Sequence, residues 1–431
     1  MIHRNSRQFI RTFFTSPTAV DAADSAEMLR KASTLRGLQA PDVWVPDNED
    51  ATAPSMRDEG VENVIDVVSE HGSDFPGEIH PRVVWHRDDA AKRHQGFQHM
   101  YRMTDPEAGA VDAIDGFVIP EVGHIDDWKK ADECFTIIEN EHGLEEGSLR
   151  MSVIIESAQA ELAMGQLIDE IGKPTNNLER LFLLVDGEVD YTKDMKAMTP
   201  TGQLPAWPEL RHNTSRGASA VGLVAIDGPF DDIRNIEGYQ QRMEENYAKG
   251  MLGIWALTPS QVEIANTNPL SPQLGSYLLT VGENDVELER VSANQYRYTG
   301  EAISVSESDG VYHFSVGGDD VELDSDELET AVSDRLSYIP SLDDIVDSME
   351  QFEEAKDAGR GAISLRREAT IVIDDIDIDI SRDRMWDEAT YQAAQTPIHL
   401  LQEVWETRSD QRDELREMYG EDVIDRALRV G

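Results

Sequence analysis

The stretch MSVIIESAQAELAMGQLIDEIGKPTNNLERLFLLVDGEVD, residues 151–190, decides the fold. It contains two near-continuous apolar runs, at 151–156 and 181–185, with apolar residues at helical spacing between them over 158–171. Continuous apolar runs are expected of parallel strands that are covered on both faces, and strands of one sheet that run in parallel need a crossover, usually a helix. The stretch therefore predicts a strand–helix–strand unit of a parallel sheet.

Similar apolar runs recur along the first 260 residues, several of them separated by segments with helical spacing. They lie at residues 11–15, 43–46, 82–86, 116–120, 151–156, 181–185, 221–227 and 253–257. Eight strands alternating with helices over about 250 residues are typical of the (β/α)8 TIM barrel. An open doubly wound sheet is the alternative, and the absence of a glycine-rich turn after the first run disfavours it.

The remaining chain changes character twice. Over residues 276–323 polar and apolar residues alternate between Gly, Asn and Asp turns, which predicts a small antiparallel β module. The chain then becomes mainly helical, with an alternating stretch at 371–380 and a helix expected at 386–405, which Pro397 should kink or split. We therefore expect a barrel over 1–270, a β module over 271–325 and a mainly helical C-terminal module over 326–431.

The charge of the chain is its strongest global property. There are 38 basic and 85 acidic residues, a formal net charge of −47, and the acids are spread along the whole sequence. Such a surface repels itself unless salt near molar concentration shortens the Debye length to about 3 Å. This predicts a cytoplasmic protein of a high-salt cell, and it argues against nucleic acid as a partner because phosphate binding needs clustered cations.

Other classes of protein are disfavoured by what the sequence lacks. No apolar run is long enough for a membrane span, and the N-terminal residues carry no secretion signal, so we expect no membrane partner. With one cysteine, Cys134, no disulfide can form within the chain. The sequence leaves open whether the protein is a homo-oligomer.

Carboxylates follow several of the expected strands. In a TIM barrel the C-terminal ends of the strands form the face that carries the chemistry. The run at 43–46 is followed by Asp47, Glu49 and Asp50, the run at 151–156 ends in Glu156, and acids recur over 186–190. Hard oxygen ligands without thiols or clustered histidines favour Mg²⁺. The alternative is that these acids are solvated surface groups, which are common in so acidic a chain.

Five segments resemble the citrate lyase β-subunit and malyl-CoA lyase superfamily, and they occur in the order of that family. They are VWVPDNEDATAPSMRDEG (43–60), GFVIPEVGHIDD (116–127), VIIESAQA (153–160), VAIDGPFDDIRNIEGY (224–239) and GIWALTPSQVEIAN (253–266). The resemblance implies a TIM barrel that handles CoA thioesters of small acids with Mg²⁺, and it makes Glu156 a metal ligand. The sequence has Leu257-Thr258-Pro259 where that family usually has Ile-His-Pro, so a role for the family's histidine is in doubt.

Three further segments resemble the malate synthases within this superfamily. HPRVVWH (80–86) resembles R-P-R-G-W-H and implies that Arg82 binds the glyoxylate aldehyde oxygen; EVDY (188–191) resembles W-D-Y and implies that Asp190 is the second metal ligand. MWDEAT (385–390) resembles the E-D-x-A-T segment and implies that Asp387 is the general base, carried by the C-terminal module. The alternatives are a structural ion pair for Arg82 and a helix cap for Asp387.

The resemblance implies a Claisen condensation of acetyl-CoA with glyoxylate, followed by hydrolysis to malate and CoA. The backbone around Gly187, Glu188 and Val189 would hold the glyoxylate carboxylate, and CoA would lie near Pro259 and Arg36. Two other functions remain open. One is a malyl-CoA or citramalyl-CoA lyase, which shares the barrel and the metal but not the C-terminal base, and the other is a non-catalytic acidic scaffold.

Overall fold

The computed structural model divides the chain into two compact units. The first comprises Met1–Tyr239, Lys249–Thr267 and Thr407–Glu414, and the second comprises Gln240–Ala248, Asn268–Glu406 and Leu415–Gly431. The structure describes residues 9–171, 178–198, 207–247, 249–267, 277–282, 284–292, 295–298, 300, 303–308, 310–316, 319–324, 327–328, 331–334 and 342–430. The boundaries expected at 270–271 and 325–326 lie outside these residues.

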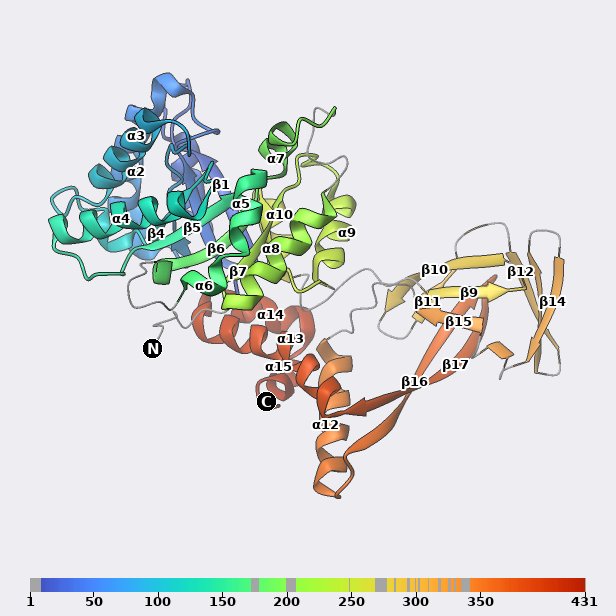
Figure 1. The fold of residues 1–431 in the computed structure, drawn as a ribbon. Coiled ribbons are helices and arrows are strands. Elements are labelled where there is room, and N and C mark those ends of the chain that lie inside the picture. The colour runs from blue at the N-terminus through green and yellow to red at the C-terminus, as the bar shows by residue number, and fades with distance from the viewer. Residues whose placement is uncertain are drawn as a thin grey trace. The chain divides into compact units, whose positions relative to one another are not determined.

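The first unit is built on an eight-stranded parallel sheet (Figure 1). Its spatial order is β3-β2-β1-β8-β7-β6-β5-β4, so the first and last strands in sequence are neighbours, as in a barrel. The strands are β1 (Thr12–Pro17), β2 (Val43–Asp47), β3 (Glu78–Ile79), β4 (Gly116–Ile119), β5 (Arg150–Ile155), β6 (Leu181–Asp186), β7 (Val224–Pro229) and β8 (Gly253–Ala256). The expected α/β TIM-barrel fold class is confirmed.

The third strand is the place where the expectation was wrong. The structure has a short strand β3 at Glu78–Ile79, and the segment 83–86 leaves the sheet. Hydrogen bonds to the β2 side continue past Pro81, because the N–H of His80 donates to the carbonyl of Trp44 and the N–H of Arg82 donates to that of Pro46. Arg82 also forms bridges to Asp47 and to Val118. These two bridges join the β2 side of the sheet to the β4 side, so the barrel closes at Arg82.

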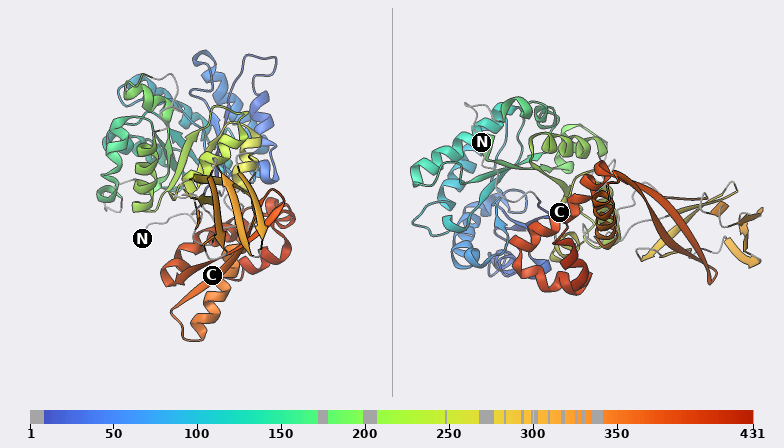
Figure 2. Two further views of the ribbon diagram at one scale, coloured as in Figure 1. Left: turned by 90° about the vertical axis from the view of Figure 1, so that its right-hand side faces the viewer. Right: turned by 90° about the horizontal axis from the view of Figure 1, so that it is seen from below.

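Helices cover the outside of the barrel (Figures 1 and 2). They are α1 (Glu27–Ser33), α2 (Arg57–His71), α3 (Ala90–Met103), α4 (Ile125–His142), α5 (Ala158–Met164), α6 (Leu167–Glu170), α7 (Glu188–Asp194), α8 (Pro208–Val221), α9 (Ile236–Tyr247) and α10 (Pro259–Thr267). The single helix expected over 158–171 is two helices, because α5 ends before Gly165 and Gln166.

Alternate residues of each strand enter two separate apolar clusters. In β5, Val153 and Ile155 belong to the large cluster that also holds helix residues such as Ala160, while Ile154 belongs to a smaller cluster with Leu183 of β6. The smaller cluster is made almost entirely of strand residues. Burial on both faces explains why these strands read as continuous apolar runs.

The second unit contains two further sheets, one of six strands with the order β15-β9-β10-β11-β16-β17 and one of three strands, β12-β13-β14. The strands are β9 (Tyr277–Val281), β10 (Asn284–Ser292), β11 (Gln295–Arg297), β12 (Ile303–Ser308), β13 (Val311–Val316), β14 (Asp319–Asp324), β15 (Val332–Asp334), β16 (Ala362–Ile373) and β17 (Ile376–Asp387). All pairings are antiparallel except β11 with β16, so the expected antiparallel character is confirmed.

The stretch of alternating residues at 371–380 is part of a long hairpin of β16 and β17. Asp374 and Asp375 form its turn with φ angles of 49° and 62°, which are the positive values that a two-residue hairpin turn of type I′ requires. The helix expected at 386–405 begins two residues later, because β17 continues through Asp387. It is α13 (Glu388–Thr407), and Pro397 lies inside it without ending it.

The described part of the C-terminal region has three more helices: α12 (Leu342–Asp357), α14 (Arg412–Tyr419) and α15 (Glu421–Ala427). A short 3-10 helix, η7 (Ser409–Gln411), connects α13 to α14. No helix in the described part of the chain has the length and apolar character of a membrane span.

Candidate active site

Glu156 lies directly after β5 and is buried. Its carboxylate accepts a hydrogen bond from the backbone N–H of Glu121. Burial raises the pKa of Glu156 well above its usual value; the nearby charge of Arg82 opposes this shift, and Asp190 adds to it. The barrel therefore brings together Glu156, Arg82 and Asp190, three residues that are separated by up to 108 positions in the sequence.

The loop from β6 to α7 is laid against Glu156. A Cβ atom at Gly187 would lie 2.6 Å from Cβ of Glu156 and 2.8 Å from its Oε2. The backbone N–H of Gly187 donates to the carbonyl of Ile155 at 3.0 Å, which holds the loop in that place. Only glycine allows the backbone to approach the carboxylate so closely.

Asp190 lies in the first turn of α7 and is half-buried. One of its carboxylate oxygens, Oδ1, accepts a hydrogen bond from Lys193 at 2.7 Å. The N-terminus of α7 directly follows Gly187, so the first N–H groups of that helix lie beside the same region. Glu156 and Asp190 thus approach from the ends of two neighbouring strands.

Arg82 is buried among carboxylates that follow β2. Its guanidinium donates to Asp47 at 3.2 Å, to Glu49 at 2.5 Å and to Asp50 at 2.7 Å, and it lies 5.7 Å from the ring centroid of Trp255. Burial raises the pKa of Glu49 to about 7, although Arg82 lowers it. The ion pair considered as the alternative for Arg82 is therefore present, yet its Nε has no hydrogen-bond partner among the described residues.

The side chains of Glu188 and Val189 differ in their burial. Glu188 is buried and forms an ion pair with Arg211 at 2.7 Å, and Arg211 also donates to Asp227 at 3.0 Å. Val189 is exposed. The contribution expected from residues 187–189 can accordingly come from the backbone N–H groups of Glu188 and Val189, which suit a carboxylate at a helix N-terminus, while the Gly187 N–H donates to Ile155.

Arg36 and Pro259 lie apart from this group by every contact that the described residues make. The Arg36 guanidinium is exposed and donates to the carbonyls of Ser33 and Leu35, within its own segment. Pro259 is exposed at the start of α10. No hydrogen bond or ion pair of the described residues links either of them to Glu156, and their proposed contact is with CoA rather than with the metal.

Asp387 belongs to the second unit, where it ends β17 and precedes α13. Its Oδ1 accepts from the backbone N–H of Thr390 at 2.9 Å and from the Thr390 hydroxyl at 3.0 Å. The backbone hydrogen bond lowers the pKa of Asp387 below its usual value. The residue therefore caps the helix, as the alternative interpretation has it, and it is ionised at neutral pH.

Two residues near Glu156 were not singled out as site residues from the sequence. Glu121 has a φ of 48°, a left-handed conformation that is rare for a non-glycine residue and that directs its N–H to Glu156. Arg87 pairs with Glu121 at 3.3 Å and with Asp194 at 2.8 Å. The sequence did offer a signal: Arg87 directly follows the HPRVVWH segment, and Glu121 lies inside the GFVIPEVGHIDD segment at 116–127.

This arrangement fits a divalent cation with oxygen ligands. A buried carboxylate beside a second one carries an excess of negative charge that a cation would neutralise. Mg²⁺ typically takes one or two protein carboxylates and completes its shell with water or substrate oxygens, so Glu156 and Asp190 could hold it. Among the described residues there is no cluster of three or more His, Cys, Asp or Glu that could form a closed metal site.

Comparisons with known proteins extend over the whole chain. Residues 21–259 match the family model of HpcH/HpaI aldolase/citrate lyase, and residues 277–392 match that of the malate synthase H C-terminal domain. The chain is 69% identical over 427 residues to an apparent malate synthase of Haloarcula marismortui, covering 99% of this chain and 98% of that protein.

Solved structures of Haloferax volcanii malate synthase are also similar to this chain. Its magnesium/glyoxylate complex is 59% identical with a TM-score of 0.62, and its pyruvate/acetyl-CoA ternary complex is 62% identical with a TM-score of 0.61. Both likenesses cover 99% of this chain and 100% of the solved chain.

A methyl group at Gly187 should disturb the site without unfolding the barrel. The Gly187→Ala variant must push Glu156 from its position, so we expect its Mg²⁺ affinity, measured by titration calorimetry, to fall by roughly 10- to 100-fold. The exposed Val189→Ala variant is the matched control and should bind normally. An unchanged affinity in Gly187→Ala would remove Glu156 from the proposed metal site.

Proposed function

The chain belongs to the malate synthase family, within the wider HpcH/HpaI aldolase/citrate lyase family, and on that premise we propose that it joins acetyl-CoA to glyoxylate and hydrolyses the product to malate and CoA. The observation that carries this proposal is the match to a malate synthase C-terminal domain at residues 277–392, in addition to the barrel. A lyase built on the barrel alone would not need that region.

Magnesium is the cofactor of this activity. Glu156 and Asp190 would hold the ion, which when bound supplies a Lewis acid and a template for the two oxygens of glyoxylate. The surrounding protein is suited to this role because Glu156 is desolvated and its pKa is raised, so the carboxylate gains most from a neighbouring cation.

Glyoxylate would be oriented by the chain's own donors. Backbone N–H groups at Glu188 and Val189 would bind its carboxylate beside Gly187, whose own N–H donates to the carbonyl of Ile155. Arg82 would donate to its aldehyde oxygen, since the guanidinium is permanently charged and its Nε has no partner among the described residues. The carboxylates around Arg82 hold the guanidinium plane in one orientation, which reduces the reorganisation needed as charge develops.

Asp387 would act as the general base. Its carboxylate takes a proton from the methyl group of acetyl-CoA, and the electron pair of the broken C–H bond forms the enolate. The enolate carbon then bonds to the aldehyde carbon, and the aldehyde oxygen becomes an alkoxide that Arg82 stabilises. The alkoxide takes up a proton from water to become the hydroxyl of the product, and Asp387 releases its proton to water. Water finally attacks the thioester of malyl-CoA, the C–S bond breaks, and CoA leaves as the thiol.

The hydrogen bonds from Thr390 give Asp387 a fixed orientation in addition to lowering its pKa. CoA is expected near Pro259, at the start of α10, with Arg36 available to its phosphates. The working environment is a high-salt cytoplasm, for which the net charge of −47 and the likeness to halophilic relatives are the support.

Release of the free thiol distinguishes the synthase from the lyase. The purified protein with Mg²⁺, acetyl-CoA and glyoxylate in molar KCl should produce free CoA, followed with a thiol reagent, and malate in equal amount. Malyl-CoA that is formed or cleaved without free thiol would identify a lyase. The absence of both reactions, together with no effect of Mg²⁺ and glyoxylate on thermal stability, would favour a scaffold.

Removing the charge from the proposed base should abolish turnover and leave substrate binding intact. We expect Asp387→Asn to lower kcat by about 10²- to 10⁴-fold, the usual contribution of a general base. Glyoxylate binding, measured by calorimetry with Mg²⁺, should be unchanged because the barrel residues are untouched. The neighbouring exposed Glu388→Gln is the control, and a normal kcat in Asp387→Asn would exclude it as the base.

Salt removal should inactivate the protein. Lowering KCl from molar to about 0.1 M lengthens the Debye length from about 3 Å to about 10 Å, so that the surface acids repel one another. Thermal stability and activity should therefore both fall, measured by circular dichroism and thiol release. An activity that is independent of KCl would contradict this account of the composition.

A further inference from the structure

A buried ion pair lies where the first two barrel strands begin. Arg11 and Asp42 precede β1 and β2, and both are buried. The Arg11 guanidinium donates to both oxygens of Asp42, at 2.9 Å from Nε and 2.8 Å from Nη2, and the Arg11 backbone N–H donates at 2.8 Å. Three hydrogen bonds thus hold the Asp42 carboxylate between the two strand starts.

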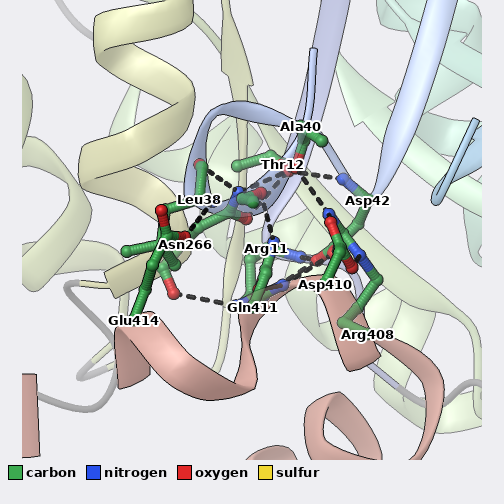
Figure 3. Close-up of polar contacts among 11 residues, drawn as sticks. Arg11, Thr12, Leu38, Ala40, Asp42, Asn266, Arg408, Asp410, Gln411 and Glu414 are labelled. Carbon is green, nitrogen blue, oxygen red and sulfur yellow. Dashed lines mark hydrogen bonds and ion pairs between the residues drawn. The ribbon is translucent and has the colours of Figure 1, made fainter. Parts of the chain in front are cut away.

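A second arginine, from the C-terminal part of the chain, reaches the same carboxylate (Figure 3). Arg408 is buried, and its Nη1 donates to Asp42 Oδ1 at 2.6 Å while its Nη2 donates to the carbonyl of Ala40 at 2.9 Å. Gln411, also buried, donates to the carbonyl of Gly37 at 3.1 Å and accepts from Arg11 at 3.0 Å. The segment Thr407–Glu414 is thereby joined to the barrel unit.

The point at which the chain leaves the barrel is fixed on the same residues. Asn266, near the end of α10, accepts from Arg11 through its carbonyl at 2.8 Å, and its side-chain amide donates to the carbonyls of Leu38 at 2.8 Å and Ala40 at 3.0 Å. The chain then leaves for Asn268–Glu406 and returns at Thr407. Arg11, Asp42 and Ala40 therefore bind the residues on both sides of the segment 268–406, which are Asn266 before it and Arg408 after it.

We propose that Arg408 is a positioning residue for the condensation. Its ion pair with Asp42 anchors the C-terminal end of α13, and the proposed base, Asp387, directly precedes the first residue of that helix. The proposal rests on the function assigned to Asp387. Arg408 directly follows Thr407, the last residue of α13, and Asp387 directly precedes Glu388, the first. A 20-residue helix is a rod of about 30 Å, so fixing its end restricts the carboxylate at its start.

The hydrogen bonds of the cluster allow the anchor to be removed without disrupting the barrel strands. Without Arg408, Asp42 keeps all three hydrogen bonds from Arg11, so no buried carboxylate is left without a cation and the two strand starts stay joined. Burial also shields the pair from salt, because screening acts on exposed charges far more than on buried ones. The anchor therefore persists at the KCl concentrations at which surface ion pairs are weakened.

The test compares Arg408→Gln with Arg360→Gln, the same substitution at an exposed arginine, in molar KCl with the full-length chain. Arg408→Gln should lower kcat for CoA release by about 10²-fold, the scale of a misplacement by 1 Å. The KM for glyoxylate and the calorimetric binding of Mg²⁺ and glyoxylate should stay within about twofold, since none of the proposed metal and glyoxylate residues changes. Arg408→Lys, which retains one charged donor, should recover part of kcat.

A second variant separates anchoring from folding. Three glycines inserted after Thr407 keep Arg408 in place and disconnect it from α13, and kcat should fall as in Arg408→Gln. The proposal is overturned if Arg408→Gln folds and retains full kcat. If Arg408→Gln does not fold, full kcat in the insertion variant overturns it. It is also overturned if glyoxylate binding is lost in parallel. Failure of the proposed function is recognised separately, because the unmodified protein would then release no CoA.

Discussion

The barrel depends on one buried guanidinium. The backbone of Arg82 bridges β2 and β4 where the short β3 has ended, so it closes the sheet, and its side chain is packed among carboxylates that would otherwise repel one another. Attraction between buried opposite charges is strong because the local dielectric is low. One residue therefore both closes the fold and keeps a permanent positive charge beside the proposed glyoxylate site.

Near Arg82, two acids at the same end of the sheet differ in how far they are buried. Glu156 is desolvated and touched by the Gly187 backbone, while Asp190 stays half-buried in the first turn of α7. The positive φ of Glu121 is related to the same carboxylate, because it directs the N–H of Glu121 to Glu156. This N–H is one donor that Glu156 has in the absence of a cation. Excess negative charge is costly here unless a cation is shared, which is the physical basis of the magnesium proposal.

The acidic composition acts at the surface, and the anchoring interactions act in the interior. Exposed acids need screening to stay close together, so their contribution changes with salt. The Arg11–Asp42–Arg408 cluster is buried, so salt screens it much less than it screens exposed charges. A protein with so acidic a surface thus has a reason to place its long-range attachments in buried, hydrogen-bonded positions rather than in surface ion pairs.

The sequence alone determined the barrel and the positions of its acids. Apolar runs report burial on both faces, and parallel strands deliver their C-terminal residues to one end, so Glu156 and the 186–190 acids could be placed before any coordinates. Periodicity could not locate β3, because that strand comprises only Glu78 and Ile79, which is too short to show a pattern. Nor could it show that Arg408 meets Asp42, or that Glu121 adopts a positive φ. Such pairings join residues hundreds of positions apart, or depend on a single backbone torsion, and only the packed tertiary structure specifies them.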